Sequence, residues 1–378
     1  MKISLVALGK IGLPLAVQFA MKGHEVIGCD VNQKTVDLVN QGIEPFPGEA
    51  HLGEYLKQVV SSGHLSATTD TTNAVSQSDA VVVVVPLFVD KDGVPDFGWM
   101  DDATKKIGAG LKKGTLVSYE TTLPVGTTRN RFAPALEKES GLKAGTDFSL
   151  VFSPERVLTG RVFADLRKYP KLVGGINETS TKAGIDFYNA VLDFDKREDL
   201  QQPNGVWDLL TCEASEMAKL AETTYRDVNI ALANQFAKFA ETANIDIAKV
   251  IAASNSQPYS HIHQPGIAVG GHCIPIYPRF YLWNDPQATV VRAAREANAG
   301  MPEHAVSLLN AELGSLSGKT VAVLGISYRG GVKESAFSGV FPTVAALKNS
   351  GAQVLVHDPM YTDEEIKNLG FEVYKIGG

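Results

Sequence analysis

Residues 3–12, ISLVALGKIG, carry the pattern on which the fold assignment depends. A short apolar run precedes the glycines, and a helical stretch with Pro14 in its first turn follows them. The segment fits G-x-G-x-x-G with Ala7 in place of the first glycine. Gly9 would let the backbone approach a pyrophosphate, and Gly12 would allow close packing of helix on strand. The segment therefore predicts a strand–turn–helix unit that binds a dinucleotide.

The next predicted strand, residues 25–30, ends in an acidic residue that favours one cofactor. Asp30 lies 21 residues beyond Gly9, where a carboxylate can bind both ribose hydroxyls and disfavours a 2′-phosphate. We therefore expect NAD rather than NADP, with its pyrophosphate at the helix N-terminus. Lys10 is either a phosphate ligand or a solvated lysine. The expected cofactor contacts of this turn are Gly9, Lys10, Ile11, Gly12 and Asp30.

Further apolar runs continue the alternation of strands and helices, at residues 81–85, 115–119, 150–152 and 172–173. The run at 81–85 is five consecutive valines. Such β-branched runs without polar alternation are typical of strands buried on both faces of a parallel sheet. The first part of the chain is therefore predicted to be a doubly wound α/β domain.

The pattern changes near residue 212. Residues 214–243 contain no Gly or Pro, and apolar positions mostly three and four apart predict one amphipathic helix of about 30 residues, about 45 Å long. A helix of that length is suited to connecting two domains or to forming a dimer interface. Residues 256–278, rich in Pro, Gly and His, predict a functional loop, and residues 288–313 predict further helix. Strands are expected at 320–324 and 353–357, so that the chain ends two strands into its last domain.

The predicted fold class is α/β, with two Rossmann-like doubly wound domains joined by a long central helix and a helical middle domain. The expected divisions are a dinucleotide-binding domain at 1–200, a central helical and dimerisation domain with a cysteine loop at 201–300, and an α/β domain at 301–378 that is incomplete at its C-terminus.

Composition excludes several classes of function. Of 378 residues, 35 are basic and 42 acidic, giving a net charge of −7 without a basic run, which argues against nucleic-acid binding. No apolar run reaches the roughly 18 residues of a membrane span, so we expect no membrane insertion. Three cysteines without CxxC spacing favour neither a disulfide scaffold nor a metal site. The expected location is the cytoplasm.

The most specific local signal for chemistry is residues 270–275, GGHCIP. A cysteine in a glycine-rich loop before a helix can approach a ligand, and a helix N-terminus stabilises a thiolate. Cys273 is therefore a candidate nucleophile, whereas a buried, inert thiol is the expectation for Cys29 and Cys212. Lys219 lies in an apolar stretch of the long helix, where it either extends to water or is held in a site with a lowered pKa.

Two segments follow predicted strands at the edge where α/β sites form. Residues 153–156, SPER, follow the strand at 150–152, and Glu155 would lie just beyond its carboxyl end. Thr122, in the segment after the strand at 115–119, would occupy the same edge and either orient a substrate or cap the next turn. Surface exposure is the alternative for Glu155.

Together these segments resemble the UDP-glucose/GDP-mannose dehydrogenase family, the nucleotide-sugar 6-dehydrogenases. The resemblance covers essentially the whole chain in the same order: the turn at 7–12, ETTLPVG at 120–126, SPERV at 153–157, the long helix with Lys219, GGHCIP at 270–275 and GISYR at 325–329. Residues 154–161 and 271–275 are most similar to the branch that acts on UDP-N-acetylhexosamines, UDP-ManNAc or UDP-GlcNAc. Such enzymes serve polysaccharide biosynthesis.

The resemblance implies a four-electron, NAD-dependent oxidation of the sugar C6 hydroxyl to a uronic acid. Cys273 would form a thiohemiacetal and then a thioester, Lys219 would stabilise oxyanions, and Glu155 would activate the hydrolytic water directly or through Thr122. Thr223 would donate one hydrogen bond. Further cofactor contacts are implied at Pro86, Thr122 and Lys333, and substrate contacts at Glu155, Arg156, Val157, Lys219, His263, Gly266, Gly270 and Arg329. A homodimer through the long helix is also implied.

Several residues depart from the family pattern. Ala7 replaces a glycine, Tyr277 stands where a catalytic aspartate is usual, and Thr223 stands where an asparagine is common. A water held by Lys219 and Thr122 is our hypothesis for the missing base. The alternatives are a UDP-glucose 6-dehydrogenase, a catalytically impaired nucleotide-sugar-binding paralogue, and a single-step hydroxyacid dehydrogenase.

Overall fold

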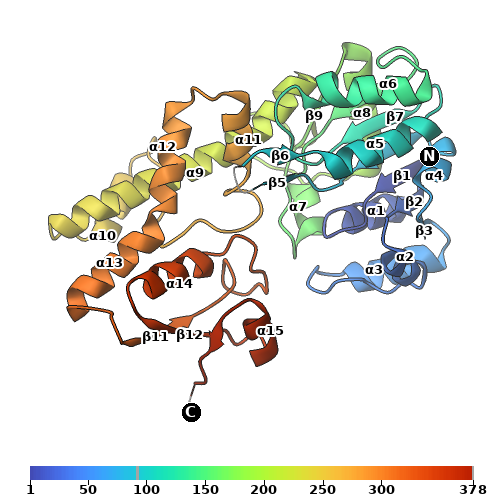
Figure 1. Ribbon diagram of the computed structural model, residues 1–378. Coiled ribbons are helices and arrows are strands. Elements are labelled where there is room, and N and C mark those ends of the chain that lie inside the picture. The colour runs from blue at the N-terminus through green and yellow to red at the C-terminus, as the bar shows by residue number, and fades with distance from the viewer. Residues whose placement is uncertain (91–92, 377–378) are drawn as a thin grey trace. The chain divides into compact units, whose positions relative to one another are not determined.

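The computed structural model describes residues 1–90 and 93–376, which form two compact units, Met1–Leu220 and Ala221–Gly378 (Figure 1). The boundary between the units falls inside the long helix α9 (Cys212–Thr242), which confirms the helix predicted at 214–243. No helix in the described part of the chain combines the length and apolar character needed to cross a bilayer.

The first unit is built on one eight-stranded sheet in the order β3-β2-β1-β4-β7-β8-β9-β10. Its strands are β1 (Lys2–Val6), β2 (Glu25–Cys29), β3 (Leu65–Thr68), β4 (Ala80–Val83), β7 (Leu116–Tyr119), β8 (Ser149–Phe152), β9 (Lys171–Gly175) and β10 (Val206–Thr211). From β3 to β8 all neighbours are parallel, as in doubly wound dinucleotide-binding folds. β4 is fully buried, and each buried valine there contributes roughly 1.5–3 kcal/mol. The predicted parallel sheet is confirmed over these six strands.

β9 runs antiparallel to β8, so the expectation that residues 172–173 continue the parallel sheet was wrong. The connection contains only the seven-residue helix α7 (Val162–Lys168), about 10 Å long, and the chain re-enters the sheet from the edge at which β8 ends. β10 then pairs parallel with β9. Because β10 begins at Val206, the sheet extends beyond the predicted domain end at residue 200, and the three-part division of the chain stays a prediction.

Two groups of helices pack on this sheet. Buried side chains of α1 (Gly12–Met21), α3 (Leu52–Ser61), α7 and α8 (Glu178–Val191) form one hydrophobic core with the strands. Helices α4 (Thr71–Ser76), α5 (Gly98–Gly110) and α6 (Ala133–Ser140) pack in series on one another (Figure 1). The remaining elements are α2 (Gln33–Asn40), the π-helix Thr128–Phe132 and the antiparallel pair β5 (Phe88–Val89) and β6 (Pro95–Asp96).

The second unit combines helices with a small parallel sheet in the order β11-β12-β13. Its strands are β11 (Thr320–Leu324), β12 (Gln353–His357) and β13 (Glu372–Val373), and its helices besides α9 are α10 (Ile247–Ser254), α11 (Tyr277–Asn284), α12 (Thr289–Ala299), α13 (Met301–Leu313), α14 (Val340–Asn349) and α15 (Asp363–Asn368). The strands at 320–324 and 353–357 are confirmed. The expectation that the chain ends two strands into this domain was wrong, because β13 adds a third.

Candidate active site

The turn after β1 has the geometry that a dinucleotide requires. Ala7 adopts the left-handed conformation that favours glycine, with φ of 77°, and its N–H donates to the Cys29 carbonyl at 2.7 Å. A Cβ atom on Gly12 would lie 1.9 Å from the Ala7 carbonyl oxygen, so only glycine fits there. At Gly9 no heavy atom lies within 4 Å of the Cβ position, which leaves that backbone open to a phosphate. Ala7 thus keeps the turn at a conformational cost of roughly 1–2 kcal/mol.

The carboxylate of Asp30 fixes this turn to the end of β2. Its Oδ2 accepts the N–H of Leu8 at 2.8 Å, and its Oδ1 accepts the N–H of Asn32 at 2.9 Å. Each oxygen keeps a second lone pair, so the carboxylate can still accept hydrogen bonds from ribose hydroxyls. Lys10 is exposed and Ile11 is half-buried in the same turn. These residues fit NAD.

The second unit contains the same arrangement, a residue with positive φ after one strand and an aspartate after the next strand. Gly325 follows β11 with φ of 108°, and its N–H donates to the His357 carbonyl at 2.7 Å. Asp358, directly after β12, accepts the N–H of Ile326 at 2.7 Å and that of Met360 at 2.8 Å. Burial acts to raise the pKa of Asp358, but these N–H groups hold it below its usual value. The two strand–turn–helix–strand units therefore share one local design.

The loops after β4, β7 and β8 meet at the carboxyl edge of the first sheet. Pro86 follows β4 and is exposed. Thr121 donates its hydroxyl to the Val85 carbonyl at 2.7 Å, which ties the loop after β7 to the loop after β4. Thr122 is 4% exposed, and Glu155 follows the adjacent strand β8. Parallel neighbours bring these predicted site residues to one edge.

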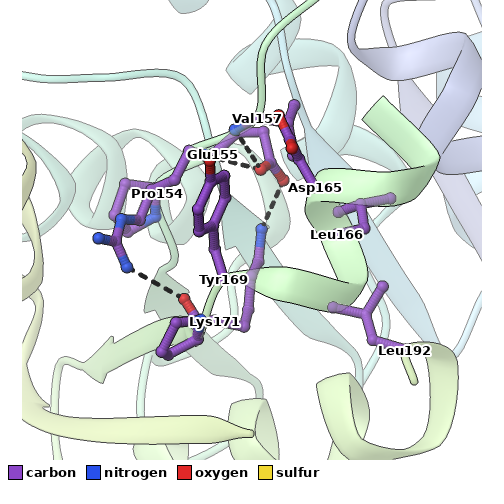
Figure 2. A pocket seen from close by; sticks show the side chains of 10 residues that line it. Pro154, Glu155, Val157, Asp165, Leu166, Tyr169, Lys171 and Leu192 are labelled. Carbon is purple, nitrogen blue, oxygen red and sulfur yellow. Dashed lines mark hydrogen bonds and ion pairs between the residues drawn. The ribbon is translucent and has the colours of Figure 1, made fainter. Parts of the chain in front are cut away.

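Glu155 lies in an ionic network rather than at a free surface. Its Oε1 accepts the N–H groups of Arg156 at 2.6 Å and Val157 at 3.2 Å, and its Oε2 accepts from the Lys171 ammonium at 2.9 Å (Figure 2). Burial acts to raise the pKa of Glu155, but Lys171 holds it below its usual value. The Arg156 guanidinium donates to the Pro170 carbonyl at 3.3 Å. The anionic form of Glu155 is thus the stable one.

Sequence reasoning missed Lys171 and did not assign a role to Glu120. The Lys171 ammonium lies 2.7 Å from Oε2 of Glu120, which is 1% exposed. Burial raises the pKa of Glu120 to about 7. The sequence shows only a lysine and a glutamate beside apolar strands. Their contact depends on the reversed direction of β9, which the local sequence does not reveal.

Glu216 is another buried acid that sequence reasoning missed. From α9 it accepts the N–H of Gly126, the N–H of Thr128 at 2.9 Å and the Thr128 hydroxyl at 2.7 Å. Burial raises the pKa of Glu216 to about 7. The contacts fix the segment after Thr122 to the part of α9 that carries Lys219. Lys219 is 7% exposed, so it does not extend into water.

Thr223 lies one helical turn beyond Lys219 on α9 and is 3% exposed. Lys219 belongs to the first unit, whereas Thr223 and Cys273 belong to the second. The proximity of the Cys273 thiol to the Lys219 ammonium therefore stays a prediction.

Within the second unit, the cysteine loop packs against the segment after β11. Cβ atoms on Gly270 and Gly271 would lie 2.6 Å and 3.1 Å from Tyr328, and the Gly271 N–H donates to the Ala336 carbonyl at 3.1 Å. Cys273 is exposed, and its carbonyl accepts the N–H of Tyr277 at 2.9 Å at the start of α11. The predicted arrangement of an accessible thiol before a helix is present.

Two asparagines of α9 fix the predicted substrate loop. Asn229 accepts the N–H of His263 at 2.9 Å, and Asn234 accepts the N–H of Gly266 at 2.9 Å. Burial lowers the pKa of His263, and Arg226 lowers it further. His263 and Gly266 are thus held by one helix of their own unit.

The two basic residues predicted in the last domain have different surroundings. Arg329 is exposed, with its guanidinium 5.9 Å from the ring centre of Tyr328. The Lys333 ammonium lies 2.6 Å from a carboxylate oxygen of Glu365 and 5.1 Å from the ring centre of Tyr361. Its proposed contact with a cofactor would have to compete with this ion pair.

A doubly wound sheet, a phosphate-binding turn and an acid after β2 define a protein with an NAD-binding domain. Comparisons identify the class further. The description "UDP-glucose/GDP-mannose dehydrogenase family, NAD binding domain" matches residues 1–192, and that family's central domain matches residues 213–300. The chain belongs to the UDP-glucose/GDP-mannose dehydrogenase family and is a nucleotide-sugar dehydrogenase that uses NAD.

Individual relatives support this assignment. A UDP-N-acetyl-D-mannosamine dehydrogenase of Pyrococcus horikoshii is 34% identical over 364 residues, covering 95% of this chain and 84% of the relative. A solved UDP-D-ManNAc dehydrogenase structure from that organism has a TM-score of 0.87 at 32% identity, covering 95% and 84% of the two chains. A UDP-glucose dehydrogenase structure from Pyrobaculum islandicum has a TM-score of 0.87 at 27% identity, covering 99% and 86%.

The exposure of the three thiols predicts selective alkylation. Burial raises the pKa of Cys29 to about 12 and also raises that of Cys212, whereas Cys273 is exposed. Iodoacetamide at neutral pH should label one thiol per folded chain, located by peptide mass spectrometry at Cys273. Cys273→Ser should remove the label. Labelling of Cys29 or Cys212 before unfolding would contradict the packing described.

Proposed function

We propose that the chain oxidises the C6 hydroxyl of a UDP-N-acetylhexosamine, UDP-ManNAc or UDP-GlcNAc, to the uronic acid. The name of the Pyrococcus horikoshii relative, which matches 95% of this chain, carries the proposal and favours UDP-ManNAc among these sugars. The exposed Cys273, the buried Lys219 and the anionic Glu155 are the residue types that such a reaction needs.

In the first oxidation the alcohol loses a proton and its carbon loses a hydride, leaving an aldehyde. Bound NAD supplies the hydride acceptor. The ammonium of Lys219 would stabilise the negative charge that develops on the C6 oxygen. The Thr223 hydroxyl would donate a further hydrogen bond to the same oxygen. Tyr277, four residues after Cys273, offers no carboxylate, and our hypothesis for the base is a water held by Lys219 and Thr122.

The remaining steps use the thiol and one water. The Cys273 sulfur adds to the aldehyde to give a thiohemiacetal, which loses a second hydride to become a thioester. Glu155 would accept a proton from the water that attacks the thioester, and the carbon–sulfur bond then breaks. The balance is one alcohol, two NAD⁺ and one water giving one carboxylic acid, two NADH and two protons.

UDP-glucose is the second candidate substrate. The Pyrobaculum islandicum UDP-glucose dehydrogenase has the same TM-score to this chain as the Pyrococcus horikoshii structure, although its identity is lower, 27% against 32%. The shared fold therefore does not favour one sugar over the other. The name of the Pyrococcus horikoshii relative favours UDP-ManNAc.

The reaction predicts two NADH per sugar nucleotide. NAD reduction should be followed at 340 nm with UDP-ManNAc, UDP-GlcNAc, UDP-GalNAc, UDP-glucose and GDP-mannose in turn, and a UDP-N-acetylhexosamine should give the highest kcat/KM. Cys273→Ser should lower acid formation by at least about 10³-fold because no thioester can form. One NADH per sugar, or full acid formation by this variant, would refute the scheme. Tight UDP-sugar binding without NADH would indicate an impaired paralogue.

We also propose a homodimer that forms through α9. Besides Met217, near the start of this helix, four large apolar side chains of its described residues remain exposed: Tyr225 at 57%, Leu232 at 45%, Phe236 at 39% and Phe239 at 66%. Their spacings of seven, four and three residues place them along one stripe. Burial of such a stripe against a second copy would stabilise an assembly. We retain the cytoplasm as the predicted location, since Cys29, Cys212 and Cys273 are free thiols.

A charged residue within the stripe should weaken the dimer. Leu232→Asp combined with Phe239→Asp should shift the sedimentation coefficient to that of a 40.5 kDa monomer at micromolar concentration. Gln235→Glu, a charge added to the same helix at an exposed polar position, is the matched control. A monomeric parent chain, or a double variant that remains dimeric, would exclude this interface.

A further inference from the structure

The cluster around Lys171 is not used by the scheme above, yet it contacts Glu155 directly. The Lys171 ammonium donates to Oε2 of Glu120 at 2.7 Å and to Oε2 of Glu155 at 2.9 Å. The side chain of Lys171 is 5% exposed, that of Glu120 is fully buried and that of Glu155 is 11% exposed. One cation is thus shared by two acids, only one of which reaches the surface of the pocket drawn in Figure 2.

The reversed direction of β9 brings these groups together. Glu120 follows β7, Glu155 follows β8, and both strands end at the same edge. Lys171 is the first residue of β9, which runs antiparallel to β8 and therefore begins at that edge. In a parallel β9, the first residue would lie at the opposite edge, about 15 Å away for strands of this length.

Tyr188 of α8 completes the enclosure of Glu120. Its hydroxyl donates to Oε1 of Glu120 at 2.6 Å and lies 2.7 Å from the Ser118 hydroxyl. The Lys171 ammonium lies 4.9 Å from the Tyr188 ring centre. Glu120 therefore has a partner at each oxygen and no access to bulk water.

The other charged groups beside Glu155 are engaged elsewhere. Asp165 of α7 accepts from the Leu158 N–H at 3.1 Å and from Arg161 at 2.8 Å. The Arg156 guanidinium donates to the Pro170 carbonyl. Lys171 and Glu120 are thus the described charges that act on the Glu155 carboxylate most directly.

We propose that Lys171 and Glu120 are positioning residues that hold the Glu155 carboxylate at the sheet edge and set its basicity. The proposal rests on the proposed function of Glu155 in thioester hydrolysis. When Glu120 carries a proton, Lys171 forms an ion pair with Glu155 alone and weakens it as a base. When Glu120 is ionised, the same ammonium is divided between two carboxylates, and the added negative charge strengthens Glu155 as a base.

The hydrolytic step should therefore accelerate as Glu120 loses its proton. Burial places the pKa of Glu120 at about 7, so the acceleration falls in the neutral range. In that step the water oxygen bonds to the thioester carbon, one water proton moves to Glu155, and the carbon–sulfur bond breaks. The thiolate of Cys273 takes up a proton when it leaves. No further reactant is required.

The test compares variants of the full chain across pH 5.5–9. Glu120→Gln is nearly isosteric and remains neutral, as protonated Glu120 is. It should abolish the rise in kcat near pH 7 and lower kcat at pH 8.5 by roughly three- to tenfold, with KM for the UDP-sugar unchanged. Lys171→Arg should keep the parental profile. Lys171→Met should lower kcat further, because burial without the cation favours the protonated form of Glu155, which cannot accept a proton from water. Glu137→Gln, which removes a surface ion pair with Lys143, is the matched control.

A second readout does not depend on activity. The raised pKa of Glu120 stabilises the folded state below the unfolded value of about 4.3, and this contribution is lost as pH rises through about 7. The free energy of unfolding of the parent, minus that of Glu120→Gln, should therefore decrease from pH 5 to pH 8 in urea titrations. Burial also raises the pKa of Glu216 to about 7, but Glu216 is present in both the parent and the variant, so its contribution cancels in the difference.

These two measurements distinguish an error in the proposed function from an error in the proposed role of Glu120. If no UDP-sugar reduces NAD, the proposed function is wrong, and the urea titrations alone decide whether Glu120 holds its proton. If the parent is active but Glu120→Gln keeps the rise in kcat near pH 7, Glu120 does not set the basicity of Glu155. A KM change without a kcat change would equally overturn the proposal.

Discussion

One lysine ammonium shared by two carboxylates determines how the edge of the first sheet is organised. Lys171 connects the ends of β7 and β8 with the start of β9 through contacts of 2.7 Å and 2.9 Å. Three charges of this kind are costly to bury unless each is paired. Here the pairing is complete, with Tyr188 and backbone N–H groups satisfying the remaining carboxylate oxygens. Removing the cation would leave two like charges facing each other at the strand ends.

A hydrogen bond from a turn N–H to an aspartate after the next strand occurs in both units. In both units a residue with positive φ follows a strand, and a carboxylate after the next strand accepts the N–H that comes next. Asp30 and Asp358 fill this position, 23 and 33 residues after Ala7 and Gly325. The turn is therefore built before any ligand is bound, which reduces the conformational entropy that binding must overcome.

Much of the fold could be predicted because apolar runs and glycine positions report local structure. β11, β12 and α9 were predicted within two residues, and the turn at 7–12 was recognised although Ala7 departs from the motif. The direction of β9 was missed, since Leu172 and Val173 are equally apolar in either direction. Lys171 and Glu120 were missed for the same reason: their meeting depends on topology, which local pattern does not encode.

Covalent trapping tests most directly whether Cys273 forms a thioester with the oxidised sugar. A Glu155→Gln chain mixed with NAD and UDP-ManNAc and quenched in acid within a second should accumulate the thioester, because hydrolysis is slowed while both oxidations proceed. Peptide mass spectrometry should locate one sugar-nucleotide acyl group per chain on the peptide that contains Cys273. An adduct on another residue, or none while two NADH are released, would contradict the account.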